Sequence, residues 1–584
     1  MEMKAGDRRT SRMASMLLAA LLTACTAPSG DAKSTSGVQA AADPGAMSPL
    51  GSYLAGRHAQ QQHDYAAAAR FFGEALAQDP NDYELLNKTF LFDVTEGRTE
   101  EASRLAERIN RIDPAAPVPN LVLSLGRIRS GDYAGADALA QKLPREGIHR
   151  FVTPLVQAWA EAGLGHPDDA LKTLDRVRSV QGFAPLADFH AGLVDDMAGR
   201  SADAAVALEK VLKSNQHANW RTIEALGSLE ERMEHPDQAK ALYERFAREN
   251  PGSDLAARAL ARLAGGQEPP PRITSAAQGA AEALFDLASV LNQSETADLA
   301  LIYARLALYL EPDFPLAKLL VADVLESEHR AEEALAIDRS IPPQSPYAWT
   351  ARLRAASNLE LMGKTDEAAK ELQAMAAERP NEVQPLVQLG DLWRSKNRFA
   401  EAVASYDEAV ARLKQPEPRD WTIFYSRGVA LERSGQWPRA EADLLHALQL
   451  QPEQPLVLNY LGYSWVDKGV KLNEALRMIE RAVELRPNDG YIVDSLGWAY
   501  YRLGNYPQAT QNLERAIELR PEDPTINDHL GDAYWQVGRL DEARSQWRRA
   551  LQFGPEADEV RTISAKLDRG LAKPSPAGAT AQGG

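Results

Sequence analysis

The sequence is nearly devoid of cysteine, since Cys25 is the only one among its 584 residues. An intramolecular disulfide needs two cysteines, so none can stabilise this chain. Its stability must come from the burial of apolar side chains. A content of 44% hydrophobic and 25% charged residues is ordinary for a folded chain with an ample core.

The residue patterns of catalytic centres are also missing. The ten histidines are scattered, and the one close pair, His58 and His63, is expected to be exposed near a first helix. The chain has no zinc-binding His-Glu-x-x-His, no Gly-x-Ser-x-Gly elbow, no P-loop and no dinucleotide fingerprint. Adjacent carboxylates such as Glu100-Glu101 fall at helix-surface positions, not at the spacing of a glycosidase pair. We therefore predict no enzyme active site, no metal and no cofactor.

Positive charge is scarce as well. The chain has 65 Lys and Arg against 82 Asp and Glu, which gives a formal net charge of −17. Nucleic-acid binding depends on clustered Lys and Arg that neutralise phosphates, so this balance argues against it. It favours neutral or basic partners, such as proteins or extended peptides.

Residues 1–25 combine basic residues with a short apolar run that ends at the cysteine. Lys4, Arg8, Arg9 and Arg12 come first, and residues 13–22 are apolar but too few to span a bilayer. The ending Leu22-Thr23-Ala24-Cys25 resembles the lipobox of bacterial lipoproteins, in which the cysteine is acylated and becomes the mature N-terminus. The resemblance implies a signal peptide over 1–25 and lipidation of Cys25. Because Thr26, not aspartate, follows the cysteine, it also implies attachment to the outer membrane, facing the periplasm.

Two segments have a composition that cannot form a packed core. Residues 26–49 are rich in Ala, Ser, Gly and Pro, and we expect a flexible tether with a root-mean-square reach of about 25 Å. Residues 571–584 are similar and are expected to be a disordered tail.

The strongest pattern is a repeat of 34 residues, carried by columns of small residues and proline. Small residues at this period let the two helices of a hairpin approach closely, and proline stops the second helix. Gly504 lies between two helices, where a positive φ is expected. The columns are Gly497 and Gly531; Ala475, Ala509 and Ala543; Ala482, Ala516 and Ala550; Pro487, Pro521 and Pro555; and, in the N-terminal half, Ala68, Ala102, Ala136, Ala170 and Ala204.

One unit shows the whole pattern: Leu496-Gly497-Trp498-Ala499-Tyr500, then Gly504, Ala509, Leu513, Ala516 and Pro521. This arrangement resembles the tetratricopeptide repeat, and the resemblance covers nearly all of the chain after the tether. It implies an all-α fold, a right-handed α-solenoid of antiparallel helical hairpins known as the tetratricopeptide superhelix.

The repeat register breaks once, between Ala239 and Ala300, in a stretch that contains Gly265-Gly-Gln-Glu-Pro-Pro-Pro271. We therefore predict two arrays joined by a linker over 265–276. The N-terminal array covers 50–264 with about six repeats. The C-terminal array covers 277–570 with about eight repeats and ends in a capping helix over 556–569.

The family resemblance implies that the first helix of each hairpin lines a concave protein-binding groove. Residues three before and one after each column glycine would face it; these are Asn459, Tyr463, Asp494, Trp498, Asp528 and Asp532. Such a row can accept hydrogen bonds from an extended backbone, attract basic groups and stack on them. It departs from the Lys, Asn and Arg clamp of chaperone-binding relatives. The alternative is that these residues solvate a polar groove or hydrogen-bond to adjacent repeats.

Three classes of function fit these observations. The favoured one is a non-catalytic envelope lipoprotein that acts as a scaffold or adaptor for a periplasmic or outer-membrane machine, such as secretion, polysaccharide export, pilus assembly or cell-wall remodelling. The second is a periplasmic chaperone that holds extended clients. The third is an enzyme whose site is built from repeat loops.

Overall fold

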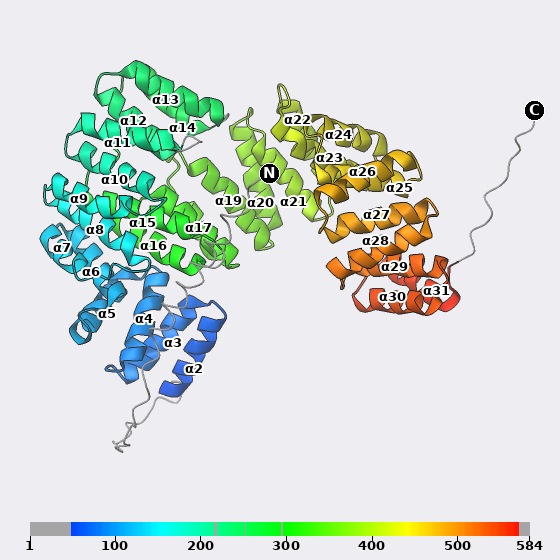
Figure 1. Cartoon of the computed structure of the whole chain (residues 1–584), viewed down its shortest axis with the longest axis horizontal. Coiled ribbons are helices and arrows are strands. Elements are labelled where there is room, and N and C mark those ends of the chain that lie inside the picture. The colour runs from blue at the N-terminus through cyan, green and yellow to red at the C-terminus, as the bar shows by residue number, and fades with distance from the viewer. Residues whose placement is uncertain (1–47, 215–218, 251–252, 294–295, 572–584) are drawn as a thin grey trace, which may run out of the picture. The chain divides into compact units, whose positions relative to one another are not determined.

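A computed structural model describes residues 48–214, 219–250, 253–293 and 296–571, and over these it contains helices and no strand. Helices α2 to α31 follow one another mainly as antiparallel hairpins, which confirms the predicted all-α solenoid (Figure 1). Cys25, the rest of the predicted signal peptide, the tether up to residue 47 and the tail from residue 572 lie outside the described residues.

The chain forms two compact units, which divide between Lys364 and Thr365. The helices of unit 1 are α2 (Pro49–Gln61), α3 (Tyr65–Gln78), α4 (Tyr83–Thr95), α5 (Thr99–Ile112), α6 (Pro117–Ser130), α7 (Tyr133–Ala140), α8 (His149–Gly163), α9 (Pro167–Arg178), α10 (Ala184–Met197), α11 (Ser201–Ser214), α12 (Trp220–Arg232), α13 (Pro236–Glu249), α14 (Asp254–Ala264), α15 (Ala276–Leu291), α16 (Ala297–Leu310), α17 (Pro315–Ser327), α18 (Ala331–Arg339) and α19 (Ala348–Leu361).

The helices of unit 2 are α20 (Thr365–Glu378), α21 (Gln384–Ser395), α22 (Phe399–Arg412), α23 (Trp421–Arg433), α24 (Trp437–Leu450), α25 (Pro455–Asp467), α26 (Leu472–Leu485), α27 (Gly490–Arg502), α28 (Tyr506–Leu519), α29 (Pro524–Gln536), α30 (Leu540–Gln552) and α31 (Ala557–Arg569), with a short 3-10 turn (Pro418–Asp420) before α23.

The glycine columns have the two roles that their positions predict. Gly504, between α27 and α28, has φ 78°, a conformation that costs a side chain energy but glycine little. Gly497 lies where α27 meets α28, and a Cβ there would stand 2.6 Å from Cγ of Leu513. A larger residue at this position would therefore push the hairpin apart.

Successive repeats are joined by an arginine near the end of the second helix, which donates to a backbone carbonyl 28 residues earlier. Arg108 donates to Pro80, Arg515 donates to Pro487, and Arg549 Nη2 donates to the Pro521 oxygen at 3.2 Å. These carbonyls follow the end of a helix, where the backbone oxygens lack intrahelical partners. The same hydrogen bond therefore recurs at equivalent positions of different repeats, in addition to the recurring packing of small residues.

Unit 1 contains helices that pack on the first helices of its own hairpins. α15 contacts α6, α8 and α10, and α16 contacts α4 and α6, so the pair lies along the side that those first helices line (Figure 1). Buried apolar residues from Ala59 in α2 to Ala334 in α18 form one continuous core.

This arrangement corrects the expected division of the chain at residues 265–276. That segment does separate α14 from α15, but α15 to α19 belong to the same compact unit as α2 to α14. The physical reason is that the break in register lets the chain turn so that α15 packs on α6, α8 and α10, where it buries its apolar residues. Six hairpins precede α14, and α15 to α30 make eight helix pairs after it, one of which, α19 and α20, is divided by the boundary between the units. That boundary lies about a hundred residues later than the linker.

Candidate protein-binding groove

The first helices of unit 2 carry the six residues singled out in the sequence. Asn459 and Tyr463 lie on α25, Asp494 and Trp498 on α27, and Asp528 and Asp532 on α29. They stand at equivalent places in three consecutive hairpins, because one residue of each pair lies three positions before a column glycine and the other one position after it. These glycines are Gly462, Gly497 and Gly531. The polar groups of three of them, Asp494, Asp528 and Asp532, are nevertheless used within the unit.

Asp494 is buried and forms an ion pair with His529 of the next first helix, with 3.0 Å between Oδ1 and Nδ1. Burial alone would lower the pKa of His529, but the Asp494 carboxylate outweighs it and raises the pKa above its ordinary value. Trp498 stacks on this His529, with 4.0 Å between ring centroids and 13° between planes. Trp498 also stacks on Tyr501, at 4.7 Å and 7°. Its ring surface is thus already in use.

Asp528 and Asp532 both accept from Lys566 of α31, at 2.7 and 2.8 Å. Asp532 also accepts from the Trp547 Nε1–H at 2.9 Å. Burial raises the pKa of Asp532 to about 6, although Lys566 opposes this effect. The capping helix is therefore fastened to α29 by a buried lysine shared between two carboxylates.

The other two members of the row, Asn459 and Tyr463, take no part in these contacts. The amide oxygen of Asn459 is buried and has no hydrogen-bond partner among the described residues. Tyr463 is half-buried, and burial followed by the nearby Asp494 charge raises the pKa of its hydroxyl to about 12. A donor from a bound chain would satisfy the Asn459 oxygen, which otherwise costs free energy.

The structure thus corrects part of the expected groove. Asp494 and Asp532 are buried and paired inside the unit, so they do not form an open acidic row. The alternative stated for these residues, hydrogen bonding between adjacent repeats, describes them and Asp528. The physical reason is that a residue at this position lies beside the next first helix, whose side chains reach it before a ligand can.

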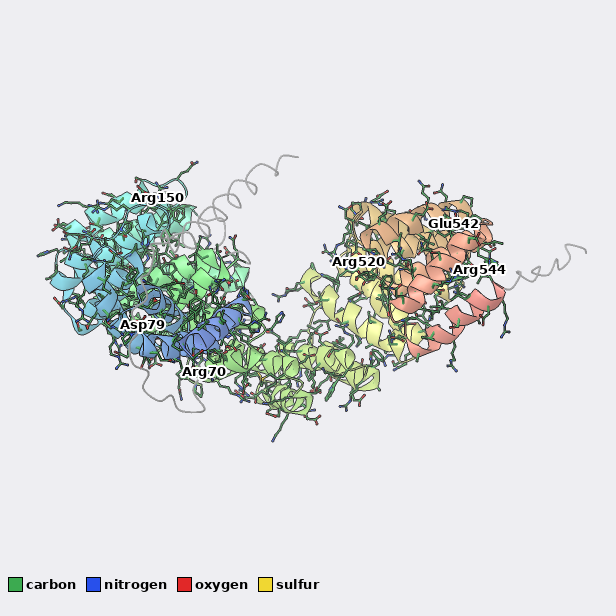
Figure 2. The ribbon with its side chains drawn as sticks, turned by 90° about the horizontal axis from the view of Figure 1, so that it is seen from below. Arg70, Asp79, Arg150, Arg520, Glu542 and Arg544 are labelled. Atoms are coloured by element: carbon green, nitrogen blue, oxygen red, sulfur yellow. The ribbon has the colours of Figure 1, made fainter. Side chains whose placement is uncertain are left out.

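Two other aromatic rings on these first helices are covered by arginines of the second helices and their ends. The Arg520 guanidinium lies 5.1 Å from the ring centre of Tyr491, and that of Arg544 lies 5.3 Å from the ring centre of Trp535. Arg520 and Glu542 are exposed at the surface of unit 2 (Figure 2). These rings offer a partner their edges rather than free faces.

Unit 1 has a counterpart of the Trp498–His529 pair that sequence reasoning missed. Trp159 of α8 and His190 of α10 are 31 residues apart, the same spacing as Trp498 and His529, and Trp159 Nε1 donates to His190 Nδ1 at 3.2 Å. Here α15 completes the site. Gly279 lies so close to the Trp159 ring that a Cβ would clash with it, and Asp286 lies 3.2 Å from His190 Nε2.

The two pairs differ in what covers them. In unit 1, helix α15 supplies a glycine beside the tryptophan and a carboxylate to the histidine. In unit 2, Tyr501 stacks on the tryptophan and Asp494 supplies the carboxylate. The first helices of unit 2 are therefore satisfied without an inserted helix. The signal that could have revealed the pair was its repeated spacing of 31 residues.

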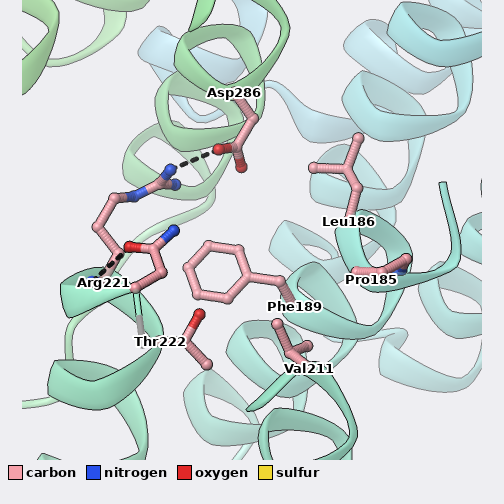
Figure 3. A pocket seen from close by; sticks show the side chains of 8 residues that line it. Pro185, Leu186, Phe189, Val211, Arg221, Thr222 and Asp286 are labelled. Carbon is pink, nitrogen blue, oxygen red and sulfur yellow. Dashed lines mark hydrogen bonds and ion pairs between the residues drawn. The ribbon is translucent and has the colours of Figure 1, made fainter. Parts of the chain in front are cut away.

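A buried ionic cluster holds α15 in place. Arg221 of α12 pairs with Glu282 and Asp286 of α15, and its guanidinium lies 5.0 and 4.9 Å from the ring centres of Phe189 and Phe285. Figure 3 shows Arg221 with Asp286 and Phe189. Burial would raise the pKa of both carboxyls, but the Arg221 charge keeps them below their usual range. The hollow beside Arg221 holds only about 130 Å³. This cluster fastens helices together and offers no charge for a ligand.

A wider cleft of about 530 Å³ lies between α20 and α22 in unit 2. Leu386, Leu389 and Trp393 of α21 contribute apolar surface to it. Its charged lining residues are paired, Arg398 with Glu401 and Arg412 with Glu408. The cleft can take an apolar side chain, but it presents no unpaired charge that would select one.

Within the described residues, no group of histidine, cysteine and carboxylate side chains is arranged to hold a metal ion. Over the same residues, no helix combines the length and apolar character needed to cross a bilayer.

Comparison with known proteins agrees with the repeat geometry. A family model described as TPR repeat matches residues 497–538, and one described as tetratricopeptide repeat matches 155–219, 353–418 and 387–455. A solved complex, the APC/C hetero-tetramer Cut9–Hcn1, aligns over 89% of this chain and 96% of its own, with 16% identity and a TM-score of 0.39.

Two curated relatives are a TPR repeat-containing protein of Pseudomonas aeruginosa and cellulose synthase 2 operon protein C of Komagataeibacter xylinus. The first is 28% identical over 191 residues, which cover 31% of this chain and 31% of the relative. The second is 25% identical over 375 residues, which cover 61% of this chain and 27% of the relative. The chain thus spans less than a third of the length of either relative. Because the family models match stretches in both units, the chain carries tetratricopeptide repeats.

Proposed function

We propose that this chain is a non-catalytic scaffold or adaptor of the bacterial envelope, anchored to the outer membrane through lipid on Cys25 and exposed to the periplasm. Solenoids of this family serve protein–protein interaction. One relative is named for a cellulose synthase operon, which suggests an envelope machine as the setting.

The observation that carries the proposal is the difference between the two units. In unit 1, α15 and α16 of the same chain cover the first helices α4, α6, α8 and α10, which leaves a partner less access to them. In unit 2, the polar groups of α27 and α29 are used between repeats, whereas Asn459 and Tyr463 of α25 take no part in those contacts. We therefore assign partner binding to unit 2, and we expect a neutral or basic polypeptide and not nucleic acid.

Affinity purification from crosslinked cells tests this assignment. A few stoichiometric partners are expected for an adaptor, and their recovery should fall with Asn459→Ala and Tyr463→Ala together. A matched control is Asn512→Ala, which alters an exposed surface side chain that bonds only to its own helix. Recovery of many unfolded outer-membrane proteins in place of a few partners would instead identify a periplasmic chaperone.

The anchor has a separate test. Cys25→Ser should abolish labelling by radioactive palmitate and release the protein into the soluble periplasm, because no other membrane anchor is predicted. If the membrane-bound amount of this variant were unchanged, the proposed lipid anchor would be wrong. The scaffold proposal would still be tested by the affinity purification.

A further inference from the structure

The first helix of unit 1 carries an apolar face that no other described element covers. Leu50 and Leu54 of α2 have 67% and 57% of their surface exposed. They stand four residues apart, and Arg57 follows three residues later, so all three lie on one side of the helix. Leu361 is similarly exposed, but no second exposed leucine lies beside it on its helix. Leu50 and Leu54 together therefore form an apolar strip, which Leu361 does not.

The charge of α2 also differs from that of the whole chain. Its sequence, PLGSYLAGRHAQQ, contains no Asp or Glu, although the chain as a whole has a formal charge of −17. Arg57 and His58 are both exposed. The helix therefore combines an apolar strip with positive charge, the combination that attracts a helix to an anionic lipid surface.

The other end of the chain shows how a solenoid is normally closed. α31 buries Ile563 and half-buries Leu567, while Arg561, Asp568 and Arg569 face outward. A terminal repeat needs such a polar outer face to remain soluble. α2 instead exposes Leu50 and Leu54 beside Arg57 and His58, which indicates that a surface with both apolar and charged groups covers its outer side.

We propose that the face of α2 formed by Leu50, Leu54 and Arg57 lies on the lipid surface to which Cys25 is attached, and so orients the first repeat. This inference rests on the proposed lipid anchor. Residues 26–47 separate Cys25 from the start of the described structure, and a chain of that length reaches about 75 Å at most when fully extended. As the predicted tether it would span about 25 Å, so that α2, the first described helix, would lie within reach of the lipid.

The single cysteine allows a direct test. The chain from Cys25 onward, the form that cleavage of the signal peptide would leave, is coupled through Cys25 to a maleimide lipid in vesicles of phosphatidylethanolamine and phosphatidylglycerol. Hydrogen exchange is then compared with that of the same chain, its cysteine blocked, in solution. We expect the amides of residues 49–61 to exchange at least about threefold more slowly on the vesicles than in solution.

The variants identify the contact. Leu50→Gln with Leu54→Gln should remove the slowing, whereas Leu361→Gln, which changes an equally exposed leucine far along unit 1, should keep it. Equal exchange on vesicles and in solution would overturn the proposal, as would loss of the slowing in Leu361→Gln. Slowing that depends on protein concentration in solution would show that a second copy covers the face.

The two proposals can fail separately. Mass spectrometry of the protein from cells reports whether Cys25 carries acyl chains, and a negative result removes the anchor. The vesicle experiment supplies its own lipid link, so equal exchange there removes only the contact of α2.

Discussion

Trp498 lies against two rings of its own unit, so its contribution is to stability before it is to binding. We expect Trp498→Ala to lower the free energy of unfolding of unit 2 by about 2–3 kcal/mol, less than the cost of truncating a fully buried tryptophan, because Trp498 is half-buried. Trp498→Phe, which keeps a ring for Tyr501 and His529, should cost less. Urea unfolding with hydrogen exchange of α27 to α29 measures both. If Trp498→Ala left stability unchanged but weakened partner binding, the ring would be a ligand anchor instead.

The acid–base groups around α29 predict that the last repeats are most stable in mild acid. The folded pKa of Asp532 is about 6 against an ordinary 3.8, so the native state holds this proton more tightly. The contribution of the protonated Asp532 carboxyl to the free energy of unfolding is therefore fully present below pH 3.8 and is lost as the pH rises through 6. The pKa of His529 is also raised, so its contribution is present below 6.5 and is lost above that.

This pH dependence can be measured by following the unfolding of α29 to α31 between pH 4 and 8. The free energy of unfolding should rise as the pH falls toward 5, and Asp532→Asn should remove the part of that slope between pH 4 and 6. Glu518→Gln, at an exposed position of α28, is the control and should leave the slope unchanged. A wild-type unit that loses stability steadily from pH 8 to 5 would contradict the assignment.

At the scale of elements, α15 is held by charges as well as by apolar packing. Arg221→Ala would leave Glu282 and Asp286 buried without their main partner, which is expected to cost about 3–5 kcal/mol. Hydrogen exchange should accelerate in α10, α12 and α15 but not in unit 2. Arg104→Ala removes an exposed pair with Glu101 and should cost about 1 kcal/mol or less. Equal effects of the two substitutions would show that the buried cluster does not hold α15.

The hairpins and their period could be predicted from the sequence because their causes are local. A small residue at Gly497 and a positive φ at Gly504 follow from contacts and turns within one hairpin. The packing of α15 could not be predicted, because its partners Trp159, His190 and Arg221 lie 61 or more residues before the residues that they contact. At Asp494 and Asp532 the predicted row is not an open groove, because His529 of the next first helix and Lys566 of the capping helix reach these carboxylates, and no column of the repeat reveals that contact.

At the scale of the whole molecule, the position of the boundary between the two units decides which fragments can fold. A fragment of residues 48–364 keeps α15 and α16 on the first helices that they contact. A fragment of residues 48–264, cut at the linker that the sequence favoured, would expose Trp159 and the apolar residues around it and would leave Arg221 without its buried carboxylates.

We therefore expect 48–364 to be monomeric by size-exclusion chromatography and to unfold in one cooperative transition. The 48–264 fragment should aggregate or melt without cooperativity, since a solenoid deprived of a covering layer exposes apolar surface over several repeats at once. Circular dichroism melting of the two fragments at equal concentration makes the comparison. Because solenoid stability is a sum of local contacts, the shorter fragment would keep helical content even while its packing is lost, so the decisive quantity is the sharpness of the transition. A 48–264 fragment that melts as sharply as 48–364 would mean that the inner helices are an addition to a complete array, and that the linker is the boundary after all.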